Sequence, residues 1–147
     1  MKKGAEVHIP DECVTASSGK RVAAREKGKK FLVLNPGGKS IRKVQVDGCV
    51  VTDSTTPRCD VLFEIGAPLE KALYVELKGN DLKHACMQLS STVKLFSAVH
   101  GDIPRHCYVV ASSVPPVRTG TQVLASKFYR DNKVRVSFKT RQNEVSV

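Results

Sequence analysis

The chain has 147 residues, enough for one domain with a substantial core, and 41% hydrophobic and 26% charged residues are usual for a globular protein. Its apolar runs are only a few residues long, which excludes a membrane-spanning helix, and its opening residues do not resemble a secretory signal. With 24 Lys and Arg against 14 Asp and Glu, the net charge is +10. This excess favours a polyanionic partner, and a solubilising surface charge is the alternative.

Five cysteines are scattered along the chain without a Cys-x-x-Cys pair, and most lie in apolar segments. We therefore expect buried free thiols and a cytoplasmic location. Aromatic residues make up 5% of the chain and tryptophan is absent, which argues against a single-strand binder built on stacking platforms.

The first 30 residues carry the least regular pattern. A short helix is expected at residues 9–14, where Pro10 and two acidic residues suit a helix start. Residues 20–30 are rich in Lys and Arg, so we expect either a basic exposed helix or a partly mobile arm. Such a segment would be solvated or would contact phosphates.

Short apolar segments separated by turn signals then predict four strands. Their connections are short, which favours antiparallel neighbours. The expected strands are residues 31–34, 41–51, 59–65 and 71–78.

From residue 81 the apolar residues recur at helical spacing, and Asn80 or Asp81 is a suitable N-cap, with Gly101 as a stop. This stripe consists of Leu82, Ala85, Cys86, Leu89, Val93 and Phe96.

The last third of the chain predicts a strand, a helix and a strand. The first strand is covered on both faces and returns to the sheet by a right-handed crossover. The final residues, 140–147, are expected to fray. The three elements are residues 106–111, 121–131 and 134–138.

Two neighbouring predicted strands carry acidic residues near their ends, where such residues can form a catalytic or metal-binding site. Asp60 lies near the start of one strand, and Glu76, Leu77 and Lys78 end the next. Because side chains alternate along a strand, Glu76 and Lys78 share one face and Leu77 packs into the core on the other. These charges would be costly in a core but can hold a divalent cation and a water beside a phosphate. A charged ladder on an exposed edge strand is the alternative.

This pattern resembles the PD-(D/E)XK nuclease superfamily, which includes many restriction endonucleases and Holliday-junction resolvases. Asp60 is followed by fifteen residues, the Glu76-Leu77-Lys78 tripeptide and a helix, and the element order agrees over about residues 30–113. One departure is Cys59, which replaces the proline of the motif. The resemblance implies an α/β fold with a restriction endonuclease-like αβββαβ core and a central mixed sheet of four to five strands, in a single domain (residues 1–147).

The resemblance also implies a metal-dependent phosphodiesterase that acts on nucleic acid, with DNA favoured over RNA and the form of the substrate left open. Asp60, Glu76 and the backbone carbonyl of Leu77 would bind Mg²⁺, with Mn²⁺ as a substitute, and Lys78 would orient the attacking water. A homodimer is left open, because small nucleases of this type often need one to hold a duplex. The alternative is a catalytically silent nuclease-like module that binds nucleic acid or a protein partner.

The superfamily often adds an acidic residue from the first helix, for which Glu12 is the first candidate and Glu26 the second. Gln88, on the helix that follows Lys78, is a further candidate to touch the site. Expected nucleic-acid contacts are Arg58, Lys20, Arg21 and Lys83.

Overall fold

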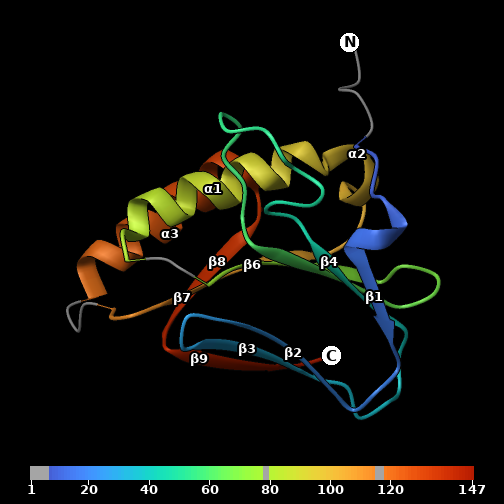
Figure 1. Cartoon of the computed structure of the whole chain (residues 1–147). Coiled ribbons are helices and arrows are strands. Elements are labelled where there is room, and N and C mark those ends of the chain that lie inside the picture. Colours follow the sequence, from blue (N-terminus) through green and yellow to red (C-terminus); the bar gives the residue numbers. More distant parts are fainter. Residues whose placement is uncertain (1–6, 78–79, 115–117) are drawn as a thin grey trace.

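The computed structural model describes residues 7–77, 80–114 and 118–147 (Figure 1). A mixed six-stranded sheet forms the centre of an α/β fold. Helices cover one face of this sheet, and a second, three-stranded sheet covers the other (Figure 1). The helical elements are a 3-10 turn (Asp11–Cys13), α1 (Leu82–Leu95), α2 (Ser97–His100) and α3 (Arg118–Asn132).

The six-stranded sheet has the order β1-β4-β5-β6-β7-β8. Neighbours from β1 to β6 are antiparallel, whereas β6, β7 and β8 run parallel to one another. The parallel pairs follow helical crossovers, because a helix returns the chain to the starting end of the sheet. The strands are β1 (Val14–Ser17), β4 (Ile41–Gln45), β5 (Val61–Ile65), β6 (Lys71–Glu76), β7 (Arg105–Ala111) and β8 (Arg135–Thr140).

The three-stranded sheet contains β2 (Arg21–Glu26), β3 (Lys29–Leu34) and β9 (Gln142–Ser146). The β2 and β3 strands form an antiparallel hairpin, and β9 pairs with β3 in parallel. This sheet packs its Phe31 and Val33 side chains against Phe63 and Val75 of the larger sheet. The alternating residues Leu62 and Tyr74 face the helices instead, so β5 and β6 contribute to both layers of the core.

The central part of the predicted fold is confirmed. The β5 and β6 strands pair antiparallel, and the α1 stripe packs on the sheet. Asp81 caps α1, since its Oδ1 accepts a hydrogen bond from His84 N at 3.1 Å. After α1, the short α2 extends the helical layer as far as His100.

The expected sheet of four to five strands is wrong, because this sheet has six. The short helix expected at residues 9–14 is present only as the 3-10 turn Asp11–Cys13, and β1 follows it directly. The expectation for the basic segment is wrong, because residues 21–26 form β2 rather than a basic helix or a mobile arm. Val22 and Ala24 alternate with polar neighbours and are buried between the sheets, so the spacing that decides the structure is that of a strand.

Predicted boundaries also differ later in the chain, and β6 ends at Glu76 rather than at residue 78. The strand expected at residues 41–51 ends at Gln45, and Gly48 adopts a φ of 78° in the turn that follows. Residues 140–147 do not fray, because β9 pairs with β3 over five residues and Val145 packs against the core between the sheets. That pairing joins segments more than a hundred residues apart, which local patterns do not reveal.

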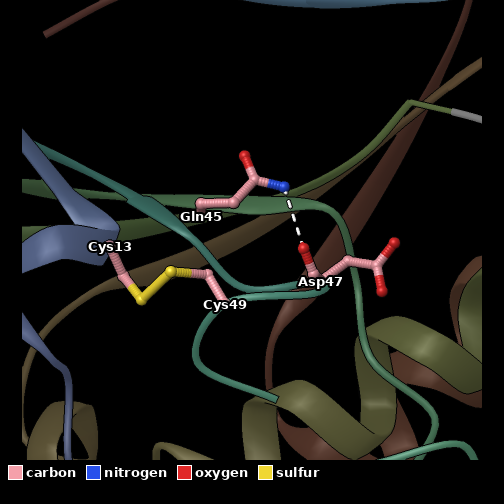
Figure 2. The surroundings of a disulfide bond; sticks show 4 residues. All are labelled: Cys13, Gln45, Asp47 and Cys49. Atoms are coloured by element: carbon pink, nitrogen blue, oxygen red, sulfur yellow. Dashed lines mark hydrogen bonds between the residues drawn. A yellow bond between two sulfur atoms is a disulfide. The ribbon is translucent and has the colours of Figure 1, made fainter. Parts of the chain in front are cut away.

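The expectation of five free thiols is wrong for two cysteines. Cys13 and Cys49 form a disulfide, with their Cα atoms 5.7 Å apart (Figure 2). The bond ties the start of β1 to the turn after β4. The other three cysteines, Cys59, Cys86 and Cys107, are free and buried as expected.

The turn joined by the disulfide carries Asp47. The Gln45 side chain donates a hydrogen bond to the backbone oxygen of Asp47 at 3.0 Å, and the Asp47 carboxylate points away from the disulfide (Figure 2). In the part of the chain that the structure describes, no helix is long and apolar enough to cross a membrane.

Candidate functional site

Asp60 and Glu76 stand opposite each other at one end of the β5–β6 pair. The register pairs Val61 with Val75, and its next step places Asp60 opposite Glu76. Directly opposed residues of antiparallel strands share one face, with Cβ atoms about 4.5–5.5 Å apart. Both residues are almost fully buried, Asp60 being 4% and Glu76 2% exposed. Two carboxylates therefore lie side by side on the face of the sheet that the helices cover.

Hydrogen bonds hold both the side chain and the backbone carbonyl of Asp60. Its side-chain Oδ2 accepts a hydrogen bond from Leu77 N at 2.8 Å. Its backbone carbonyl accepts hydrogen bonds from Val46 N at 3.0 Å and from Asp47 N at 3.2 Å. The side chain of Asp60 is thereby held against the end of β6, and its backbone against the turn that the disulfide anchors.

Helix α1 holds the two residues that precede Asp60. Gln88 Nε2 donates a hydrogen bond to the Arg58 carbonyl at 3.2 Å. The backbone N–H of Cys59 donates to Thr92 Oγ1 at 2.8 Å, and this hydroxyl donates in turn to the Gln88 carbonyl at 2.8 Å. The spacing of Gln88 and Thr92 places both on one side of the helix, so α1 sets the position of Asp60.

A cleft of about 660 Å³ opens beside the two carboxylates. Its lining combines the end of β5–β6, the first turns of α1 and the loop at residues 54–58. The residues that contribute are Asp47, Ser54, Thr55, Thr56, Pro57, Arg58, Asp60, Glu76, Asn80, Asp81, His84, Met87 and Gln88. We call this feature the carboxylate cleft, because Asp60 and Glu76 line it.

The loop on one side of the cleft is held by internal hydrogen bonds. Asp53 Oδ2 accepts from both hydroxyls and both backbone N–H groups of Thr55 and Thr56, which lowers its pKa to about 2. The Arg58 guanidinium pairs with Asp47 at 2.9 Å and donates to the Thr56 carbonyl at 3.0 Å. Arg58 therefore joins this loop to the disulfide-anchored turn.

The oxygen donors in the cleft suit a hard divalent cation. Mg²⁺ takes oxygen ligands and commonly binds through one or two carboxylates while keeping several waters. Asp60 and Glu76 provide two adjacent carboxylates, and the Leu77 backbone lies against Asp60. Within residues 7–77, 80–114 and 118–147, no group of three or more His, Cys, Asp and Glu side chains is arranged to hold a metal ion. Backbone or water oxygens would have to complete the coordination.

None of the described residues that line the carboxylate cleft is a cysteine. Cys59 precedes Asp60 and is fully buried, and this burial raises the pKa of its thiol far above the usual range. Burial likewise raises the pKa of Cys107 strongly and that of Cys86 to about 11. Burial therefore disfavours the reactive thiolate form at all three cysteines.

The structure brings together only part of the predicted site. Asp60, Glu76, Gln88 and Arg58 line one cleft, whereas Lys78 lies outside the described residues. Leu77 is buried between the sheets, as expected.

The other predicted residues lie elsewhere. Glu12 is exposed on the 3-10 turn and does not line the carboxylate cleft, and Glu26 lies in a separate cleft at the β2–β3 turn. Lys20 and Arg21 are at the opposite end of β2 from that turn. Lys83 lines a cavity between α1 and α3 instead.

Sequence reasoning missed three contributors to the site. Asp47 lines the cleft from the turn after β4. This turn is not predicted, because the pattern of residues 41–51 indicates one continuous strand. Asp81 was predicted only as a helix cap, yet it also lines the cleft. Thr92 was not among the predicted site residues. Its position four residues after Gln88, on the same side of the helix, is the signal that could have identified it.

Neither a protein-family model, nor a curated protein, nor a solved structure matches this chain.

Proposed function

We propose that this protein is a metal-dependent phosphodiesterase that cuts DNA at the carboxylate cleft, with the restriction endonuclease-like site that its sequence pattern resembles. The proposal rests on one observation: Asp60 and Glu76 are buried carboxylates, opposite each other across β5 and β6, in the wall of a 660 Å³ cleft. Burying two carboxylates side by side is costly to the fold, and ionisable groups in such surroundings are typical of functional sites.

Asp60, Glu76 and the Leu77 carbonyl would hold Mg²⁺ or Mn²⁺. When bound, such an ion polarises the scissile phosphate and lowers the pKa of a bound water. Lys78 follows directly and is assigned the role of orienting the attacking water, as the resemblance implies. Gln88 and Thr92 act as positioning residues, because they hold the backbone that leads into Asp60.

The charge of the whole chain supports a polyanionic substrate. A net charge of +10 draws nucleic acid toward the protein through counterion release, while the cleft itself is rich in carboxylates. A cation in the cleft would offset the repulsion between these carboxylates and a phosphate. DNA is preferred to RNA on the resemblance alone.

A catalytically silent module that binds nucleic acid remains the second candidate. One observation favours it: the third carboxylate expected from the N-terminal segment, Glu12, does not line the cleft. A homodimer and a cytoplasmic location also remain predictions. The Cys13–Cys49 disulfide bears on the location, because disulfides persist mainly in oxidising compartments.

A cleavage panel tests the proposal. Duplex, branched, flap and single-stranded DNA, together with RNA, are incubated with the protein in Mg²⁺, in Mn²⁺ and in EDTA. We expect cleavage of at least one DNA substrate in either metal and none in EDTA. If no substrate is cut in either metal, the silent binding module replaces the nuclease.

A further inference from the structure

A second cleft, of about 770 Å³, lies between the β2–β3 turn and the β8–β9 turn. Its lining holds five cationic side chains and one carboxylate. These charged residues are Arg25, Glu26, Lys27, Lys29, Lys30 and Arg141. We call it the basic cleft.

The backbone builds this cleft from segments far apart in the sequence. Lys30 N donates a hydrogen bond to the Arg141 carbonyl at 2.9 Å, and Arg141 N donates to the Ala111 carbonyl at 2.8 Å. Arg141 thereby joins the end of β7 in the larger sheet to the hairpin in the smaller one. The basic residues therefore lie on two hydrogen-bonded turns of the folded domain, and they do not belong to a mobile arm.

The cationic side chains are presented outward from these turns. Arg25 and Lys30 are paired across the hairpin, so they share a face, and Arg25, Lys27 and Arg141 are exposed. Glu26 pairs in register with Lys29 on the other face. Like charges held this close repel one another, and an anionic ligand relieves that repulsion.

The basic cleft lies at the same end of the sheet as Asp60 and Glu76. Glu76 is in register with Val109, and Val109 with Phe138, so these residues form one row across β6, β7 and β8. Phe138 is two strand spacings, or about 10 Å, from Glu76. The β8–β9 turn at Arg141 comes three residues later, where the chain passes into the smaller sheet. In Figure 1 the turns that form the basic cleft lie at the same end as the C-terminal end of β6 and the start of α1. An extended polyanion can therefore reach both clefts.

We infer that the basic cleft binds the phosphate backbone of a DNA duplex whose adjoining part reaches the carboxylate cleft, an inference that rests on the proposed function for the second contact. Lys and Arg side chains are common partners of DNA phosphates, which carry no sequence information. None of the described residues that line the basic cleft is aromatic, whereas single-strand sites rely on aromatic stacking. Phosphate binding is assigned to Arg25, Lys27, Lys30 and Arg141. The first three belong to the basic segment at residues 20–30, and Arg141 is added by the fold.

The test uses substitutions that remove charge and suit the backbone. Lys27 has a φ of 47° and Arg141 a φ of 65°, and asparagine tolerates this left-handed region better than most residues. The variant is the double substitution Lys27→Asn/Arg141→Asn. The matched control is Lys133→Asn/Arg135→Gln, because Lys133 is also exposed with a positive φ of 57° but lies at the opposite end of β8.

Binding of a short fluorescein-labelled DNA duplex is measured by anisotropy in EDTA over a series of salt concentrations, with thermal unfolding as the check on folding. We expect the slope of log affinity against log salt to fall in magnitude by about 0.9 for each phosphate that the variant no longer neutralises, hence by about two for the double variant. The control should keep the slope of the parent.

Equal slopes for the parent and the double variant would overturn the inference, as would an equally reduced slope in the control. A single strand that binds as tightly as the duplex would overturn the assignment to a duplex. Binding in EDTA does not require cleavage, so the two proposals can fail separately. A parent that cuts no DNA, with a double variant of reduced slope, refutes only the nuclease. A parent that cuts DNA, with a double variant of unchanged slope, refutes only the basic cleft.

Discussion

The carboxylate of Asp60 accepts a hydrogen bond from the backbone N–H of Leu77 at 2.8 Å, and this contact joins the start of β5 to the end of β6. The Leu77 side chain packs on the opposite face, in the core between the two sheets. The packing of the smaller sheet therefore helps to determine where the Asp60 carboxylate lies.

This coupling predicts different effects for two leucines of similar burial. Leu77→Ala and Leu73→Ala each remove a buried side chain from the same core and should lower the free energy of unfolding by about 2–5 kcal/mol. Only Leu77 touches Asp60, so only Leu77→Ala should also reduce the rise in unfolding temperature caused by Mg²⁺. Calorimetry with and without the ion measures both quantities, and an equal ion response in the two variants would contradict the coupling.

The Thr92 hydroxyl predicts a second, more local effect. Thr92→Val leaves the buried N–H of Cys59 without its acceptor and should lower the free energy of unfolding by about 1–3 kcal/mol. Cleavage should fall as well, because the chain leading into Asp60 loses an anchor. Thr92→Ser retains the hydroxyl and serves as the control. Denaturant unfolding and a cleavage assay check the pair, and a valine variant that matches the serine variant in both would exclude the positioning role.

The elements that sequence predicts well are those with local, periodic signals. The α1 stripe and the β5–β6 pair follow from spacing, and the opposition of Asp60 and Glu76 follows from that pair. The β9 strand could not be foreseen, because its partner β3 lies more than a hundred residues away in the chain. The many charges at residues 20–30 predict an exposed helix or arm, whereas the segment contains the strand β2. Only Val22 and Ala24, which alternate along this strand, indicate that one face is buried.

The candidate site likewise contains residues that the sequence predicts and residues that only the fold brings there. Asp60 and Glu76 could be found from residue type and spacing, whereas Asp47 enters the cleft through a turn, and a disulfide holds that turn from outside. A disulfide depends on the distance between two residues in the fold, here 5.7 Å between the Cα atoms of Cys13 and Cys49. The sequence separation of the two cysteines contains no such information.

Glu64 gives the stability of this protein a defined dependence on acid pH. His100 Nε2 lies 2.6 Å from Glu64 Oε2, and Arg42 Nε lies 3.1 Å from Oε1. The hydrogen bond with His100, and then the charges of His100 and Arg42, lower the pKa of Glu64 below its ordinary value of 4.5 against the opposing effect of burial. Because the folded pKa is the lower one, this stabilisation is complete above about pH 4.5 and is lost as pH falls through the folded value.

The test compares two glutamates on the same hairpin. Glu64→Gln should unfold at a temperature that depends less on pH below 4.5 than that of the parent. Glu70→Gln is the control, since Glu70 is exposed and pairs with Lys39 at the surface. Thermal unfolding over a pH series gives the slopes. The role of Glu64 is refuted if the parent and Glu64→Gln have the same slope.

The Cys13–Cys49 disulfide predicts a response to reductant. Its cysteines are 36 residues apart, and closing a loop of that size in the unfolded chain stabilises the fold by about 3–4 kcal/mol. Reduction should lower the free energy of unfolding by that amount, and Cys49→Ser should do the same and then be insensitive to reductant. Thiol titration of the denatured, unreduced protein should find three free thiols. Five would mean that the bond does not form.

The carboxylate cleft makes the most specific prediction, because three residues of the predicted site are assigned different roles. Asp60→Ala and Glu76→Ala remove metal ligands, so both should abolish cleavage and the Mg²⁺-dependent rise in unfolding temperature. Lys78→Ala removes a positive charge that competes with the cation. It should abolish cleavage but leave Mg²⁺ binding equal or slightly tighter. Cleavage assays and thermal unfolding with and without Mg²⁺ measure the two effects.

Asp60→Asn separates the metal site from the fold. Its amide oxygen can still accept the hydrogen bond from Leu77 N, so the variant should remain folded while losing the charge that binds the ion. Duplex binding in EDTA should survive all of these substitutions, because it depends on basic residues outside the cleft. A purely structural carboxylate pair would give variants that lose stability but cut as fast as the parent, and in that case the activity belongs to another site.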